Sequence, residues 1–182
     1  MHFSLLLPTF LAWAYIASAK ITWSLQKVPI PTDDQADAYE RIEAALGAAV
    51  ARYRRFVHAD KHLTALYLPV PGVPTAEANI DGFITYGKDR TYMTERTTLH
   101  EISHTLGIGT GPGWDRMCFK EDWPTALPLL RSFDGKKAEI NCDTSHFWPY
   151  GLNYNKEWSD ENADRHCQMV QAMIDDGIND LL

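Results

Sequence analysis

Residues 100–107 read HEISHTLG, and this stretch decides the centre of the fold. On an α-helix, residues four apart lie on the same face, so His100 and His104 can bind one metal ion. Glu101 follows the first of them and can take a proton from a water molecule on that ion. A solvated helix could carry two histidines by chance, but apolar residues at helical spacing within this stretch indicate a helix packed on a core. The pattern therefore predicts a zinc site with its general base beside it.

Residues that can cap a helix lie at both ends of this predicted metal helix. Thr94 or Thr97 can accept a hydrogen bond from the first turn and so begin the helix. Thr98, with Glu101 three residues later, imitates a capping box. A start at Thr94 instead leaves the Glu101 carboxylate free for chemistry. Gly107 can adopt the left-handed conformation with which helices often end.

The first nineteen residues have the pattern of a signal peptide. Apolar residues dominate this stretch, and Ala17-Ser18-Ala19 supplies the small residues of a cleavage site. Pro8 interrupts the apolar run, which falls short of the ~20 residues that a membrane-spanning helix needs. We therefore expect a secreted protein without a membrane anchor, in which residues 20–182 form a single domain.

The net charge indicates which binding partners are unfavourable, and the cysteines indicate what to expect in an oxidising compartment. The formal net charge of −7 argues against binding to nucleic-acid phosphates or to an anionic membrane surface. Cys118, Cys142 and Cys167 all follow the metal helix. In an oxidising compartment two of them are expected to form a disulfide, and the third is buried or free. Their spacing does not decide which two pair.

The remaining sequence predicts an α+β fold. Alternating apolar and polar residues predict strands at 21–25, 63–68 and 80–86, with a short edge strand at 91–93. Helical periodicity predicts a long helix from Thr32 or Asp33 to about Phe56, and a last helix from about 160 to 175. The Gly-, Pro- and Trp-rich region 109–154 is expected to be irregular.

These elements suggest how the domain is arranged. The long helix backs a small mixed sheet, and the metal helix lies between that sheet and an irregular lower lobe that carries the C-terminal helix. Arg52, Arg54 and Arg55 lie near the end of the long helix, where their charges suit the helix dipole. We expect these three side chains to be solvated.

Taken together, HEISHTLG and this order of elements resemble the zincin metallopeptidases. The longer pattern HExxHxxG is similar to the opening of the metzincin signature, whose third ligand follows three residues after the glycine. Thr110 holds that position here, and a neutral hydroxyl is a poor zinc ligand. Residues 92–96 and 146–154 are also similar to small secreted zincin-like proteins of fungi and bacteria. The resemblance implies a secreted zinc peptidase whose third ligand lies elsewhere in the chain.

His146 is the predicted third ligand. It lies downstream of the metal helix in a loop dense in aromatic residues, where zincins return their third ligand. A histidine stacked within an aromatic cluster is the alternative. His58 and His62 are expected in a solvated loop, and His166 is expected to be an ordinary packed or surface residue of the last helix.

Three carboxylates compete with His146 for that role: Asp143, Asp115 and Glu157. Asp143 could instead accept a hydrogen bond from a ligand imidazole and fix its tautomer. Tyr150 and Tyr154 are candidates to stabilise the oxyanion of a tetrahedral intermediate, and Tyr154 is the one we assign to catalysis.

The sequence thus predicts a secreted, monomeric zinc metalloendopeptidase acting on polypeptides. Glu101 is the general base, and His100, His104 and His146 hold Zn²⁺. An extended substrate is expected to pair with an edge strand within residues 85–93. The alternative is a non-catalytic, zinc-stabilised binding module that presents the tryptophans of its lower lobe to carbohydrate or protein. A copper site built on an N-terminal histidine is excluded, because cleavage after Ala19 would leave Lys20 first.

Overall fold

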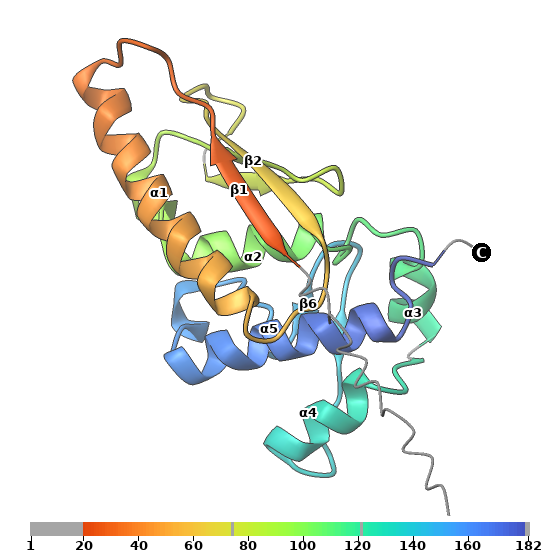
Figure 1. The fold of residues 1–182 in the computed structure, drawn as a ribbon. Helices are drawn as coiled ribbons and strands as arrows, with labels where there is room; N and C mark the ends of the chain where they lie inside the picture. Colours follow the sequence, from red (N-terminus) through yellow and green to blue (C-terminus); the bar gives the residue numbers. More distant parts are fainter. Residues whose placement is uncertain (1–19, 74, 121, 181–182) are drawn as a thin grey trace, which may run out of the picture.

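A computed structural model describes residues 20–73, 75–120 and 122–180. The predicted signal peptide lies outside these residues. Within them, no helix combines the length and apolar character needed to cross a membrane. The described residues form a mixed α+β fold with five α-helices and a small mixed sheet, so the predicted fold class is confirmed at that level (Figure 1).

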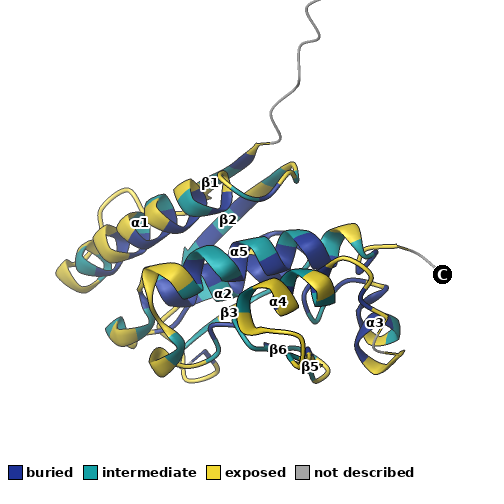
Figure 2. Cartoon of the chain, turned by 90° about the horizontal axis from the view of Figure 1, so that it is seen from below, coloured by how far each residue is buried: buried dark blue, intermediate teal, exposed yellow. Residues whose placement is uncertain are grey.

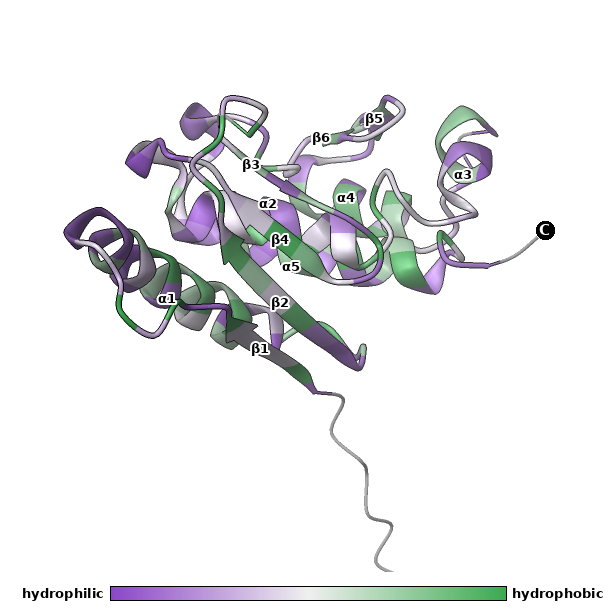
Figure 3. Ribbon diagram, turned by 90° about the horizontal axis from the view of Figure 1, so that it is seen from above, coloured by the Kyte–Doolittle hydropathy of each residue, from purple (hydrophilic) through white to green (hydrophobic). Residues whose placement is uncertain are grey.

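The main sheet has four strands in the order β1-β2-β4-β3. Their bounds are Ile21–Leu25 for β1, Lys61–Tyr67 for β2, Ala76–Ala78 for β3 and Phe83–Tyr86 for β4. β1, β2 and β4 are parallel, and β3 runs antiparallel to β4 at one edge. Hydrophobic residues occupy much of β2 (Figure 3). Its Leu63 and Ala65 are fully buried.

The predicted edge strand at residues 91–93 is wrong. Arg90–Tyr92 forms a 3₁₀ turn, which begins at Asp89 because that side chain accepts a hydrogen bond from the Thr91 N–H. The edge strand is instead β3, earlier in the chain. This difference matters for the site, because β3 packs alongside α2 (Figure 3).

Helix α1, Asp33–Tyr53, covers one face of the sheet, as predicted. Thr32 and Gln35 form a reciprocal capping box at its first turn. Its predicted apolar stripe is buried at every position: Tyr39, Ile42, Ala45, Leu46, Ala49, Val50 and Tyr53.

Arg52 is not the solvated residue that its position predicted. Its side chain is only 13% exposed and forms ion pairs with Glu95, Asp160 and Asp164. These carboxylates belong to α2 (Glu95–Thr105) and α5 (Asp160–Asp175). One guanidinium therefore joins three helices. Partly buried ion pairs of this kind contribute more to the stability of the fold than exposed pairs do, because they are partly shielded from water.

Helix α2 lies at the centre of the molecule, between the sheet and α5 (Figure 1). Thr94 caps it by accepting from the Thr97 N–H, as predicted. The Thr98 hydroxyl donates to the Thr94 carbonyl, so Thr98 does not form a capping box with Glu101. Gly107 follows the helix with a φ of +113° and turns the chain away.

The region after α2 is more ordered than the sequence predicted. It contains α3 (Trp114–Lys120), α4 (Ala126–Asp134), a short hairpin of β5 (Asn141–Cys142) and β6 (Phe147–Trp148), and the 3₁₀ turn Asn155–Glu157. Helix α5 then follows with the bounds that the sequence predicted. Its inner side is buried against α2, whereas much of α4 is exposed (Figure 2).

Candidate metal centre

His100 and His104 lie one turn apart on α2, and their Nε2 atoms are 3.2 Å apart. His146 approaches them from the turn between β5 and β6. Its ring centroid is 5.4 Å from that of His100 and 5.7 Å from that of His104. One ring nitrogen from each histidine lies within 4.8 Å of the other two. The predicted convergence of these three residues is confirmed, and they are close enough to hold a metal ion.

In each of the three imidazoles, Nδ1 already has a partner. His100 Nδ1 lies 2.9 Å from the Gly151 carbonyl, and His104 Nδ1 lies 2.8 Å from the Ile108 carbonyl. His146 Nδ1 lies 3.4 Å from the Asp143 carboxylate. A neutral imidazole that donates through Nδ1–H presents Nε2 as its electron-pair donor. This is the arrangement of metal-ligating histidines, in which the second nitrogen fixes tautomer and ring orientation.

The electrostatics of the two helix histidines also suit a metal. Burial, reinforced by neighbouring His104, lowers the pKa of His100 to about 3. Burial also lowers the pKa of His104. Both rings are therefore neutral near pH 7, which is the form that binds metal. Zinc bonds of about 2.0–2.1 Å in a tetrahedron place ligand nitrogens roughly 3.3 Å apart, close to the spacing of His100 and His104. His146, with a side chain 38% exposed on a turn, has the most freedom to adjust.

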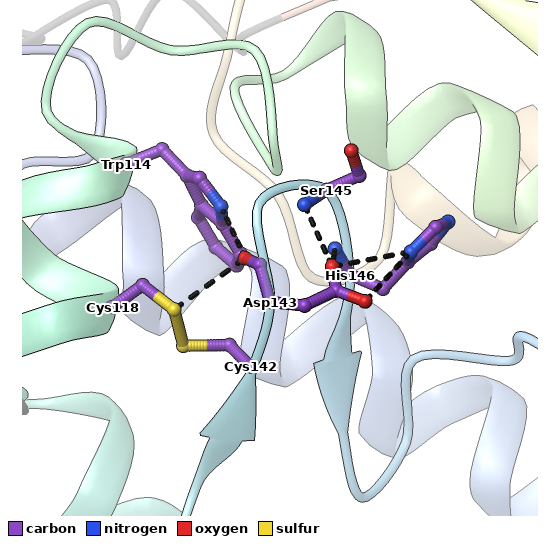
Figure 4. Close-up of a disulfide and its surroundings, with 6 residues drawn as sticks. All are labelled: Trp114, Cys118, Cys142, Asp143, Ser145 and His146. Carbon is purple, nitrogen blue, oxygen red and sulfur yellow. Dashed lines mark hydrogen bonds and ion pairs between the residues drawn. A yellow bond between two sulfur atoms is a disulfide. The ribbon is translucent and has the colours of Figure 1, made fainter.

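Asp143 is placed as a partner of His146, one of the two roles considered for it. Burial opposes its charge, but the N–H groups of Ser145 and His146 outweigh this effect and lower the pKa of Asp143. The carboxylate is thus ionised at neutral pH and can orient the ring. Figure 4 shows this turn with its internal hydrogen bonds.

A disulfide holds the same hairpin. Cys118 on α3 is bonded to Cys142, the residue before Asp143 (Figure 4). The indole Nε1 of Trp114 also donates to the Asp143 carbonyl at 3.0 Å. The predicted single disulfide is confirmed, and Cys167 is the free, buried cysteine. The hairpin is therefore tied to α3 on the side opposite His146.

Glu101 is buried beside the histidines, with 5% of the residue exposed. No group among the described residues donates a hydrogen bond to its carboxylate. Burial raises the pKa of Glu101 to about 8; Arg96 opposes this shift and Glu77 adds to it. A cation held by the histidines would favour the charged carboxylate. A carboxylate in this setting is suited to accepting and returning a proton near neutral pH.

The three histidines and Glu101 line one cavity of about 450 Å³. β3 contributes Ala76, Glu77 and Ala78 to its lining, which also includes Tyr92, Arg96 and Asn153. Sequence reasoning did not name these side chains as part of the site, although Tyr92 falls within the residues 85–93 that were predicted to pair with substrate. Tyr92 and Arg96 belong to the stretch 92–96 that resembles zincin-like proteins, and that was the available signal.

The two tyrosines proposed for the oxyanion do not line this cavity. Tyr154 is 56% exposed, and its ring stacks under the Lys156 ammonium. The Tyr150 hydroxyl donates to Asp134 and accepts from Arg165. Neither position supports the catalytic role assigned to Tyr154, because an oxyanion donor must reach the reacting atoms. Among the described residues, Tyr92 is the tyrosine that lines the cavity.

The other ligand candidates lie outside the cluster. Thr110 lines the cavity, but its hydroxyl donates to the His104 carbonyl. Glu157 accepts from the Asn153 N–H, and Asp115 belongs to α3. His62 lies in β2, not in a loop as predicted, and its ring contacts the hydroxyls of Thr22 and Ser24.

His166 is packed in the core, one of the two settings expected for it. It is fully buried, and burial lowers its pKa to about 4, so the ring is neutral. Its Nδ1 lies 2.7 Å from the Tyr150 carbonyl and its Nε2 lies 2.8 Å from the Tyr53 hydroxyl. That hydroxyl donates to the Leu99 carbonyl. This chain of bonds fixes α2 directly before His100.

Replacing His146 by Ala is expected to weaken zinc binding sharply, because two imidazoles hold the ion less well than three. Asp143→Asn should weaken binding by about 10- to 100-fold, as expected for loss of a ligand's hydrogen-bond partner. Competition titration with a zinc-binding dye measures both affinities. Thermal melting of the metal-free variants is the control. Unchanged zinc affinity in His146→Ala with lowered stability would mean that His146 only packs in the cluster.

Comparison with known proteins gives no relative for this chain: no protein-family model, no curated protein and no solved structure matches it.

Proposed function

We propose that this chain is a secreted zinc metallopeptidase of the zincin type. One observation carries the proposal: three histidines with anchored Nδ1 atoms converge next to a buried carboxylate in a single cavity. A His₃ donor set suits tetrahedral zinc, which leaves a fourth position open in catalytic sites. A purely structural ion would have no use for Glu101. Secretion rests on the predicted signal peptide, with which the Cys118–Cys142 disulfide is compatible.

The chemistry of peptide hydrolysis divides between the metal and the protein. Zinc, when held by the three histidines, acts as a Lewis acid and makes water a nucleophile at neutral pH. Glu101 would take the proton as the water oxygen bonds to the peptide carbonyl carbon, and would pass it to the amine nitrogen as the C–N bond breaks. Its burial keeps bulk water from competing for the carboxylate, and the anchored Nδ1 atoms of His100 and His104 keep both rings aimed at one point.

β3 is the strand that we propose to bind the substrate backbone, in place of the predicted residues 85–93. Thr75 and Asn79 hydrogen-bond to the β4 side through their carbonyl and N–H groups. In an antiparallel pair these bonds alternate, so the backbone groups of Ala76 and Ala78 point away from β4. An extended peptide can add to this edge beside α2.

Replacing Ala78 by Pro tests this strand. Proline removes the outward N–H but leaves the bonds of β3 to β4 in place, and an edge strand tolerates it. Loss of one such hydrogen bond should lower kcat/KM by about 10-fold while zinc content stays the same. Peptide hydrolysis and metal analysis measure the two effects. A proline variant that cleaves as well as the parent would move the substrate to another edge.

The proposed function itself is tested on purified residues 20–182. Zinc content is measured by mass spectrometry, and a proteome-derived peptide library is digested with and without 1,10-phenanthroline. We expect one zinc per chain and cleavage that the chelator stops. One zinc per chain without cleavage of any peptide would leave the binding module as the better reading. Of the tryptophans that such a module could present, Trp114 and Trp123 are buried and Trp158 is 39% exposed.

A further inference from the structure

Arg96 lies on the same face of α2 as the two helix histidines, one turn before His100. It lines the cavity that contains Glu101 and the histidines, yet only 7% of the residue is exposed. A cationic side chain therefore forms part of the wall of the proposed active site. Neither the zinc ligands nor the general base requires a charge at this position.

Among the described residues, the guanidinium of Arg96 has no anionic partner. Nη1 donates to the Leu152 carbonyl at 2.6 Å and Nη2 to the Thr97 hydroxyl at 2.9 Å. Nε is buried without a partner, and no carboxylate of the described residues forms an ion pair with it. A guanidinium has five N–H groups in a rigid fork, so three of them remain unused. Burying a charge in this way is costly unless an anion completes the site.

Arg52 shows how the same protein treats a buried arginine with a structural role. Burial opposes its charge, but hydrogen bonds to Glu95, Asp164 and Asp160 outweigh that effect and raise the pKa of Arg52. Burial lowers the pKa of Arg96, because it is opposed only by charge interactions with Tyr92, Glu101 and Glu157 and by no hydrogen bond to a carboxylate. The two arginines share their burial and differ in whether carboxylates surround them.

The carboxylates near Arg96 are committed to other roles or lie at a distance. Glu101 acts on Arg96 only through longer-range attraction and is needed for proton transfer. Glu157 accepts from the Asn153 N–H. Glu77 lines the same cavity from β3, but it is exposed to solvent, which screens its charge. An anion that reaches Arg96 must therefore come with the substrate.

We propose that Arg96 binds a carboxylate of the substrate, so that the enzyme selects peptides with an acidic group on one side of the cleaved bond. This inference rests on the proposed peptidase function. Arg96 and His100 are four residues apart, or about 6 Å along the helix. An extended chain advances about 3.3 Å per residue, so the carboxylate lies roughly two residues from the cleaved bond. An Asp or Glu side chain, or a free C-terminal carboxylate, supplies this chemistry.

The test compares matched peptides. The library digest first identifies a cleaved sequence, from which peptides with Glu or Gln at each position within three residues of the cleaved bond are made. A third form of each carries a C-terminal amide in place of the free acid. We expect kcat/KM to be about 10-fold or more higher for the carboxylate at one position, the gain expected from a charge-assisted, two-pronged hydrogen bond. The amide series shows whether a side chain or the chain end supplies it.

Variants of the protein assign the preference to Arg96. Arg96→Gln should cleave the Glu and Gln peptides equally, and Arg96→Lys should keep part of the preference because it retains charge but loses the fork. Arg116→Gln is the matched control. Arg116 also has a buried Nε without a partner, but it lies on α3 and does not line the cavity. Thermal melting and zinc content show whether each variant is folded.

Two outcomes overturn the inference: a wild-type enzyme that cleaves Glu and Gln peptides alike, or a preference that survives in folded Arg96→Gln. If Arg96→Gln does not fold, the comparison of the Glu-over-Gln preference in Arg96→Lys with that of the wild type decides whether the inference holds. Binding of a fluorescent peptide library, made in matched Glu and Gln forms without reference to a cleaved sequence, to Glu101→Gln protein separates this inference from the proposed function. If the Glu101→Gln protein binds the Glu peptides more tightly than the Gln peptides, and this difference depends on Arg96, the carboxylate site stands. If the wild type then cleaves none of the peptides, the peptidase proposal fails.

Discussion

Glu101→Gln is expected to reduce peptide cleavage by roughly 100- to 10,000-fold, the contribution typical of a positioned general base. Glutamine has nearly the same shape as glutamate but cannot take up the proton. Glu101 is 95% buried and accepts no hydrogen bond from the described residues, so the change removes little from the fold. Zinc should remain bound at one ion per chain, because none of its proposed ligands changes.

The measurement pairs hydrolysis of a quenched fluorescent peptide with metal analysis of the same preparation. Glu77→Gln is the matched control, since Glu77 is a carboxylate of the same cavity that lies on the exposed strand β3. It should keep most of the activity. A Glu101→Gln variant as active as the parent would remove Glu101 from the mechanism, whereas equal loss in both variants would point to a general effect of charge in the cavity.

The second large effect is expected at the helix ligands. His104→Ala, or His100→Ala, should abolish stoichiometric zinc binding and cleavage together. The metal binds the folded protein, so it also stabilises it: an ion present at 1,000 times its Kd adds about 4 kcal/mol to the free energy of unfolding. A chelator should therefore lower the melting temperature of the wild type and leave that of His104→Ala unchanged.

Calorimetry with and without chelator, together with zinc analysis, measures this difference. His62→Ala is the control, because His62 is an exposed histidine on β2 that does not belong to the cluster. It should keep both its zinc and its response to the chelator. Stoichiometric zinc retained by a His100→Ala, His104→Ala double variant would refute the site as proposed.

The long elements of the fold were predictable because their signals are local. The buried stripe and the cap at Thr32 define α1, and Ser159 caps α5 by accepting from the Asn162 N–H. β3 escaped prediction, since its sequence Ala-Glu-Ala has little strand propensity and three residues show no clear alternation. Thr91 and Tyr92 have high strand propensity, yet the Asp89 cap turns them into a 3₁₀ turn. Local capping outweighed propensity there.

The candidate site likewise contains residues that local sequence patterns place and residues that only the tertiary fold places. Helical spacing alone brings His100 and His104 together and puts Glu101 beside them. The approach of His146 depends on a hairpin that pairs across its own turn, and no local pattern encodes that. Aromatic density around Tyr154 could not indicate where its side chain points. The environment of Arg52 depends on α5, more than one hundred residues later in the chain.

The disulfide has a consequence for how the ligand set comes together. His104 and His146 lie far apart in sequence, and bringing them to one ion restricts the chain between them. The bond from Cys118 to Cys142 removes 24 residues from that path and leaves less than half of it. Each doubling of a flexible loop adds about 0.6 kcal/mol to the cost of closing it. The disulfide therefore lowers the entropy cost of folding this segment, and because the metal binds the folded protein, we expect a reduced chain to unfold and release its ion more readily than an oxidised one.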